Sequence, residues 1–159
     1  MQTTQGDADA RTDVLAFDAL ARALIGIAVE SVEAAAQPVT LTQFRLLLVL
    51  DGLGRVPSSR LAAALGSNAS SVTRLADKLE AHGYLTRGGD EHNRSIVTVA
   101  VTGAGHDLVS DVLAHRHHTL GTILDQLSPT ERTAATRSAT RIADLAAGRT
   151  PAVTGPVPL

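Results

Sequence analysis

Polar side chains gather on one face of a short stretch, residues 69–82, where their chemistry suits an anionic partner. At about 100° per residue, Ser70, Thr73 and Arg74 fall on one side of a helix. The apolar Leu79 falls on the opposite side. Hydroxyl and guanidinium groups donate hydrogen bonds to phosphate oxygens and to base edges. A helix over 69–82 would therefore present the groups that DNA reading requires.

Further polar residues at this stretch extend the predicted contact surface. Asn68 and Ser71 flank the helix start, where backbone N–H groups and the helix dipole attract phosphate. Helix capping alone would also explain both residues. Arg74 has Asp77 at i+3 as an alternative ionic partner. The full set of predicted DNA contacts is Asn68, Ser70, Ser71, Thr73, Arg74, Lys78, Arg87 and Arg94.

The elements that position this helix form a helix-turn-helix followed by a hairpin. An amphipathic helix over 58–65 precedes it and stops at Gly66. Gly83 ends helix 69–82, because glycine adopts positive φ at low cost. Two predicted strands and an eight-residue polar loop between them follow, at residues 84–87, 88–95 and 96–101. Hairpin loops usually run about two to five residues, so this longer loop indicates a functional wing. The helix-turn-helix and the hairpin together therefore predict a winged helix.

The run LAAALGSNASSVTRLADKLEAHGYLTR, the loop end Asn93-Arg94-Ser95 and the VTGAG run from Val101 resemble the MarR family of bacterial regulators. The resemblance covers residues 12–147. It implies a dimeric, ligand-responsive repressor that binds a double-stranded, pseudo-palindromic DNA operator. Helix 69–82 would lie in the major groove and wing 88–95 in the minor groove.

The wing departs from the usual family pattern of an acid, any residue and an arginine. Asn93 and Ser95 stand at the acid and arginine positions, and Arg94 falls between them. The resemblance therefore assigns the family's DNA-contacting wing arginine to Arg94 only in part, although a narrow minor groove favours arginine. Arg87, at the end of the first wing strand, is predicted to contact phosphate.

The predicted fold class is mainly α with a small β-hairpin wing, flanked by long helices. A capping box of Thr40 and Gln43 favours a helix over a strand for the LLLVL run that follows. Arg55-Val56-Pro57 is expected to pair with the wing strands, and Thr102 to cap the next long helix. The predicted parts are a disordered tail (1–11), an N-terminal dimerisation helix (12–38), the winged region (39–101), C-terminal dimerisation helices (102–147) and a mobile tail (148–159).

Apolar faces on the long helices exceed what one small domain can cover, so a homodimer is expected. Residues 40–100 carry seven basic and five acidic side chains, although the whole chain has a net charge of −2. The N-terminus has no apolar signal segment, and no run approaches the roughly 20 apolar residues that span a bilayer. We expect a cytoplasmic protein without a membrane partner.

Enzyme chemistry is not expected. The chain has no cysteine, which also excludes disulfides and thiolate zinc sites. It shows no nucleophile elbow and no phosphate-binding loop, and no cofactor is predicted. Two alternatives to the DNA-binding repressor remain: a winged-helix module that binds proteins, and a metal-responsive regulator. The second rests on Asp111, His115 and His118, whose i, i+4, i+7 spacing suits zinc. Charged and polar residues away from the core usually form only a solvated face, which is the favoured explanation for these three.

Three arginines are candidates for an anionic effector between the dimer helices and the winged region, the crevice that the resemblance implies. Arg116 interrupts the apolar stripe of its helix. It could extend its charge to solvent at a dimer seam or act as counter-charge for the effector. Arg22 and Arg45 are further candidates of the same kind.

Overall fold

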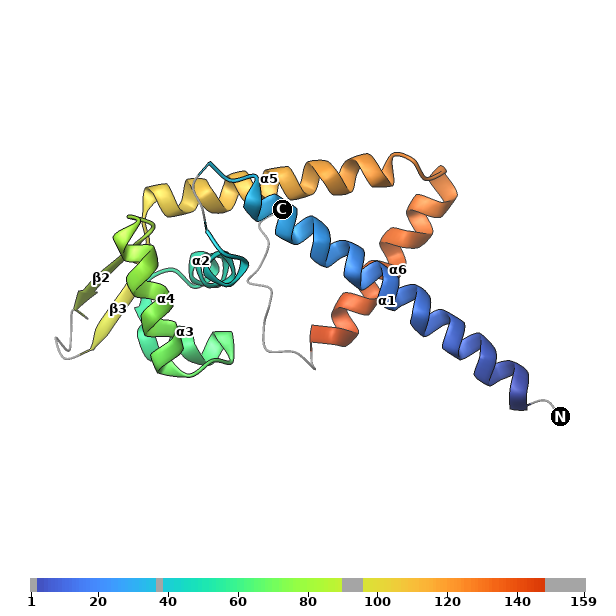
Figure 1. The fold of residues 1–159 in the computed structure, drawn as a ribbon, viewed down its shortest axis with the longest axis horizontal. Helices are drawn as coiled ribbons and strands as arrows, with labels where there is room; N and C mark the ends of the chain where they lie inside the picture. Colours follow the sequence, from blue (N-terminus) through green and yellow to red (C-terminus); the bar gives the residue numbers. More distant parts are fainter. Residues whose placement is uncertain (1–2, 37–38, 90–95, 148–159) are drawn as a thin grey trace.

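The computed structural model describes residues 3–36, 39–89 and 96–147, with side chains from residue 9 onward (Figure 1). Its elements in chain order are α1 (Thr3–Glu33), α2 (Leu41–Leu53), β1 (Val56–Pro57), α3 (Ser58–Leu65), α4 (Ala69–Ala81), β2 (Leu85–Gly89), β3 (Val97–Val101), α5 (Gly103–Leu124) and α6 (Pro129–Ala147). The predicted fold class, mainly α with a small wing sheet, is confirmed.

Helix α2 lies at the centre of the winged lobe, the compact part formed by α2–α4, the sheet and the start of α5 (Figure 1). Thr40 Oγ1 accepts from Gln43 N at 3.2 Å, and Thr40 N donates to Gln43 Oε1 at 2.8 Å. The predicted capping box is therefore confirmed, and it fixes the helical start that decides against a strand. The side chains of Phe44, Leu47 and Leu50 are at most 1% exposed.

The wing sheet has the strand order β1-β3-β2, and both pairings are antiparallel. Val99 on β3 stands opposite Val56 on one side and Arg87 on the other. The predicted pairing of the link before α3 with the wing is thus confirmed. Thr98 is buried, and its hydroxyl donates to Gly88 O at 3.1 Å, which holds the base of the wing together.

The helix-turn-helix has the predicted turns. Gly66 ends α3 in the left-handed conformation with φ 60°, and Asn68 caps α4. After α4, Gly83 has φ 77°, a value that side chains with a Cβ rarely adopt. These turns set α4 across α3 in the arrangement typical of the motif.

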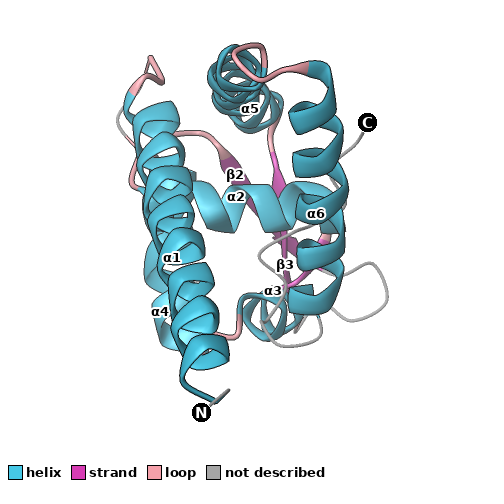
Figure 2. Ribbon diagram, turned by 90° about the vertical axis from the view of Figure 1, so that its right-hand side faces the viewer, coloured by secondary structure: helices cyan, strands magenta, loops and turns pink. Residues whose placement is uncertain are grey.

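Two arms project from the winged lobe: helix α1, and the far end of α5 together with α6 (Figure 1). Figure 2 shows α1 and α6 on opposite sides, with α5 above and α2 behind. All the buried hydrophobic residues that the structure describes lie between Val32 and Val112. Large apolar side chains are instead exposed along the arms: Val14, Leu15, Phe17, Leu20, Leu24, Ile25, Ile123, Leu127, Ile142 and Leu145. None of the α6 residues is buried.

The predicted N-terminal boundaries were wrong. Helix α1 begins at Thr3 within the predicted tail 1–11, and it ends at Glu33, before the predicted end at 38. The tail prediction relied on missing apolar periodicity, but an exposed helix needs none at its outer end. No proline interrupts residues 3–33, so the helix continues outward.

Other boundaries moved less or lie outside the description. Strand β2 continues to Gly89, two residues into the predicted loop 88–95, because Gly88 and Gly89 pair with Thr98 and Val97. The rest of that loop and the predicted tail 148–159 lie outside the described residues. Within the described residues, no helix is long and apolar enough to cross a bilayer.

The start of α5 packs tightly on Tyr84, the residue just before the first wing strand, β2. Thr102 N donates to Tyr84 O at 3.1 Å, and Thr102 Oγ1 accepts from Gly105 N at 3.2 Å. A Cβ on Gly105 would stand under 3.0 Å from Tyr84 O and from Val101 Cγ1. The Tyr84 backbone on one side and the Val101 side chain on the other leave no room for an added methyl group at Gly105.

We therefore expect Gly105→Ala to lower the free energy of unfolding by about 1–3 kcal/mol through overpacking. Gly103→Ala is the matched control, because a Cβ there meets nothing within 4 Å and alanine favours helix by up to about 1 kcal/mol. Urea unfolding of both variants measures the difference. Equal stability of the two would contradict the packing described at this joint.

Candidate nucleic-acid interface

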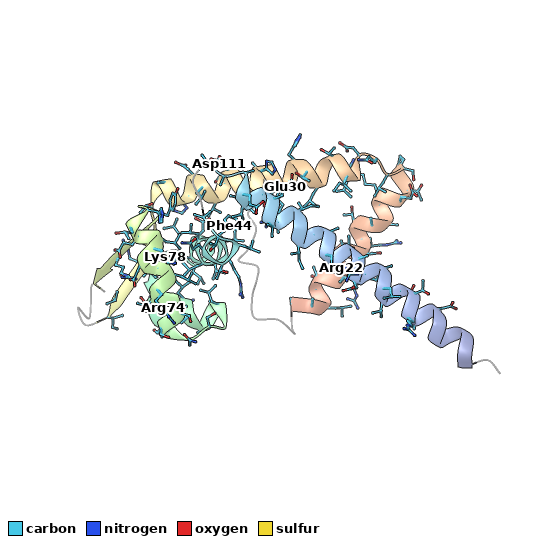
Figure 3. The ribbon with its side chains drawn as sticks, in the orientation of Figure 1. Arg22, Glu30, Phe44, Arg74, Lys78 and Asp111 are labelled. Atoms are coloured by element: carbon cyan, nitrogen blue, oxygen red, sulfur yellow. The ribbon has the colours of Figure 1, made fainter. Side chains whose placement is uncertain are left out.

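Helix α4 is amphipathic, and its polar side is open. Val72, Ala76 and Leu79 are buried against the lobe. Four predicted contact residues lie exposed on the other side: Ser70, Thr73, Arg74 and Lys78. Figure 3 shows Arg74 and Lys78 on the winged lobe, far from the projecting part of α1. The structure thus brings the predicted α4 residues onto one surface.

The start of α4 is capped as the sequence predicts. Asn68 Oδ1 accepts from Ser71 N at 2.8 Å and from Ser70 Oγ at 2.9 Å. Thr73 Oγ1 donates to Ala69 O at 2.9 Å. The capping role of Asn68 is therefore confirmed, and its side-chain oxygen is held by α4 itself. The two serines stay at the helix N-terminus, where the dipole favours an anion.

Arg74 does not pair with Asp77 among the described residues. The Asp77 carboxylate instead lies 2.7 Å from Arg87 Nη2. This excludes the alternative in which Asp77 neutralises Arg74 within the helix. Arg74 and Lys78 are exposed cations on α4, without an ion pair inside the described ranges.

Arg87 points from β2 to α4. Besides Asp77, its guanidinium reaches Glu80 Oε2 at 3.3 Å from Nη1, and Nη2 donates to Thr73 O at 3.3 Å. Its side chain is 28% exposed. The sequence analysis predicted that Arg87 contacts phosphate. In the structure its three contacts direct the guanidinium towards α4. Arg94, the predicted wing contact, lies outside the described residues.

A mostly apolar hollow of about 390 Å³ separates α3, α4 and the wing. Its walls come from three places: Ser58, Ser59 and Leu61 on α3; Ala69, Val72, Thr73 and Ala76 on α4; Arg87, Val97 and Val99 on the wing. Ser58 Oγ donates to Val97 O at 3.3 Å and joins α3 to the wing. Helices α3 and α4 and the wing therefore line one shared hollow.

The three predicted effector arginines do not meet. Arg22 pairs with Asp18 at 2.6 Å on the exposed part of α1, away from the lobe (Figure 3). Arg45 Nη2 donates to Leu65 O at 3.3 Å. Arg116 lies elsewhere, where α5 crosses the end of α1. They do not form one cluster.

Arg116 is held by a single serine. Its Nε and Nη2 donate to Ser31 Oγ at 3.3 and 3.2 Å, and its guanidinium carbon stands 5.5 Å from the centre of the Phe44 ring. Ser31 is fully buried, and its hydroxyl donates to Ala28 O at 2.8 Å. One donor and two acceptor sites of the hydroxyl are thus used. Burial lowers the pKa of the Arg116 guanidinium.

The predicted zinc candidates gain no support from the geometry. Asp111, His115 and His118 follow one another along α5, but no three His, Cys, Asp or Glu side chains in the described part of the chain are grouped to hold a metal ion. Even if the three side chains met, a structural zinc site would still need a fourth ligand. Asp111 lies on the outer side of α5 (Figure 3).

Sequence reasoning missed two polar residues that organise the lobe. Ser31 was not singled out, although it lies on the buried end of α1 and binds a residue 85 positions away. Arg55 Nη1 donates to Thr98 Oγ1 at 3.3 Å across the wing. Only the position of Ser31 near the apolar Ile27 and Val32 could have signalled burial.

A family model described as the MarR family matches residues 37–94. The structure of RV1404 from Mycobacterium tuberculosis is 30% identical, with a TM-score of 0.78, over 89% of this chain and 94% of that one. The chain belongs to the MarR family. This family is one of transcriptional regulators and not of enzymes, as the sequence predicted.

Two further proteins are similar to this chain, one in sequence and one in fold. The transcriptional repressor MprA of Escherichia coli K12 is 32% identical over 99 residues, 61% of this chain and 56% of MprA. The matched segment thus spans little more than half of that curated relative. FabT of Streptococcus pneumoniae, solved in complex with DNA, shares the fold at a TM-score of 0.71 and 17% identity, over 89% of this chain and 99% of that one.

The Ser31 contact yields a stability prediction. We expect Ser31→Ala to lower the free energy of unfolding by about 1–3 kcal/mol, since a partly buried guanidinium loses its hydrogen-bond acceptor. Ser110→Ala on the exposed side of α5 is the control, with a change within about 0.5 kcal/mol. Denaturant titration of both variants and of the wild type measures the two changes in the free energy of unfolding. Two equal, small changes would mean that solvent already satisfies Arg116.

Proposed function

We propose that this MarR-family chain is a DNA-binding transcriptional repressor that acts as a homodimer on a pseudo-palindromic operator. The observation that carries the proposal is the exposed polar side of α4, with its capped start and its two cations, Arg74 and Lys78. A helix of this kind fits the major groove, and its first turns reach base edges. The wing beside it would reach the minor groove through Arg94.

The predicted contacts at the start and in the first half of α4 have proposed parts in this complex. Ser70, Thr73 and Arg74 are proposed to contact bases or phosphates in the major groove. Asn68 and Ser71 would bind a phosphate through the start of α4, where backbone N–H groups are positive. The excess of basic over acidic side chains in residues 40–100 supports this orientation, because phosphates attract the lobe and not the acidic remainder.

The exposed apolar arms support the dimer. Ile142 and Leu145 on α6 are 42% and 60% exposed, and six large apolar side chains of α1 are exposed as well. Exposed large apolar side chains in this number indicate an interface with a partner. A second copy would cover both arms and hold two α4 helices about one helical turn of DNA apart.

Repression is proposed from the relative MprA, which is named a transcriptional repressor. The cytoplasm, where bacterial DNA lies, is the compartment that this function implies. A small anionic effector is proposed to act at Arg116, whose guanidinium is partly buried beside a neutral serine. Such a ligand would release DNA only if it binds the two conformations with different affinity.

We expect Arg74→Ala to cost about 1–3 kcal/mol of operator-binding free energy and to reduce the salt slope by about one. Fluorescence anisotropy with duplex DNA from upstream of the gene, over a salt series, measures both quantities. Arg132→Ala is the matched control, because Arg132 pairs with Asp125 far from α4. Negligible affinity of the wild type even at low salt would favour the alternative, a protein-binding module.

We expect Leu145→Lys to dissociate the dimer, since an unpaired charge buried in an apolar interface costs about 3 kcal/mol or more. Light scattering after gel filtration gives the mass. Thr140→Lys on the opposite side of α6 should leave the mass unchanged. A wild-type protein that elutes as a monomer, or a Leu145→Lys variant that stays dimeric, would refute the proposed interface.

A further inference from the structure

Two carboxylates share the exposed side of α4 with its cations. Asp77 and Glu80 are 53% and 39% exposed, and both belong to the helix that carries Arg74 and Lys78. If α4 enters a groove of DNA, bare carboxylates there would repel the phosphates. The surface needs a cation for these two groups before it can approach DNA.

Arg87 meets both carboxylates from the neighbouring strand. Its two terminal nitrogens lie 2.7 Å from Asp77 Oδ1 and 3.3 Å from Glu80 Oε2, and one of them also donates to Thr73 O. Its backbone is fixed by pairing with the fully buried Val99. We call Arg87, Asp77 and Glu80 the Arg87 cluster. It joins strand β2 of the wing to the second half of α4.

We infer that Arg87 is a positioning residue for DNA binding and not a phosphate contact. It cancels the charge of the two carboxylates and holds the wing strand at a fixed place beside α4. Arginine suits this task because its planar guanidinium can bind two carboxylates and a carbonyl at once. The inference rests on the proposed function, since it names how the DNA-reading helix and the wing are kept in register.

The test is a double-mutant cycle on DNA affinity. The probe is a fluorescein-labelled duplex that the wild-type protein selects from a random-sequence pool. Arg87→Gln is compared in two backgrounds, the wild type and Asp77→Asn/Glu80→Gln. We expect about a tenfold loss of affinity in the wild-type background and less than about a twofold loss in the neutralised one.

The salt dependence separates positioning from direct contact. In the neutralised background Arg87→Gln should change the salt slope by less than about half a unit, whereas loss of a phosphate contact lowers it by about one. Arg74→Gln is the matched control, with an equal loss in both backgrounds. An equal loss for Arg87→Gln in both backgrounds, with the slope reduced by about one, would overturn the inference, as would no loss in either.

The free protein gives a separate readout. If the wild type selects no duplex, the proposed function fails, and the same cycle measured by urea unfolding then decides whether the Arg87 cluster couples wing and helix. Non-additivity of about two- to fivefold in the unfolding constant supports the coupling, as for close ion pairs that keep some exposure. Additive effects of the three substitutions would overturn it.

Discussion

Burial of α2 is the constraint on which the rest of the structure depends. Its apolar residues touch the sheet, α3, α4, α5 and the end of α1, so every other part of the lobe is positioned against one helix. Burying a side chain such as Phe44 or Leu47 contributes about 1.5–3 kcal/mol. Since α4 packs on α2 through Val72, Ala76 and Leu79, the core fixes which side of α4 stays open. The exposed polar side of α4 is therefore determined by the apolar side that packs on α2.

Two different kinds of exposed surface lie in separate parts of the molecule. The lobe carries a polar side on α4 with a wing beside it, and the arms carry exposed apolar side chains such as Leu24 and Leu145. The first suits an anionic polymer, and the second suits a further copy of the chain. Arg116 and Ser31 lie where α5 crosses α1, between these two surfaces. In the proposed dimer, a change in that crossing would alter the spacing of the two α4 helices.

Local signals in the sequence were sufficient for most of the fold. The Thr40 capping box, the Asn68 cap and the turns at Gly66 and Gly83 lie within a few residues of the elements that they define, so pattern reasoning recovers them. The start of α1 was not recovered, because an exposed helix can extend beyond its apolar stripe. The contacts of Arg87 and Arg116 were not recovered either. They join groups 7 to 85 positions apart, and only the assembled core brings those groups together.

Site-directed cleavage of operator DNA would show whether α4 faces the DNA. The chain has no cysteine, so Ala69→Cys at the start of α4 carries a tethered iron-EDTA group at a unique position. We expect strand cleavage at two sites centred about 10–10.5 base pairs apart, one for each α4 of the proposed dimer. Ser110→Cys on the exposed side of α5 should cut only at background level. Cleavage by Ala69→Cys at that same background level, in a complex that forms, would contradict the claim that α4 faces DNA.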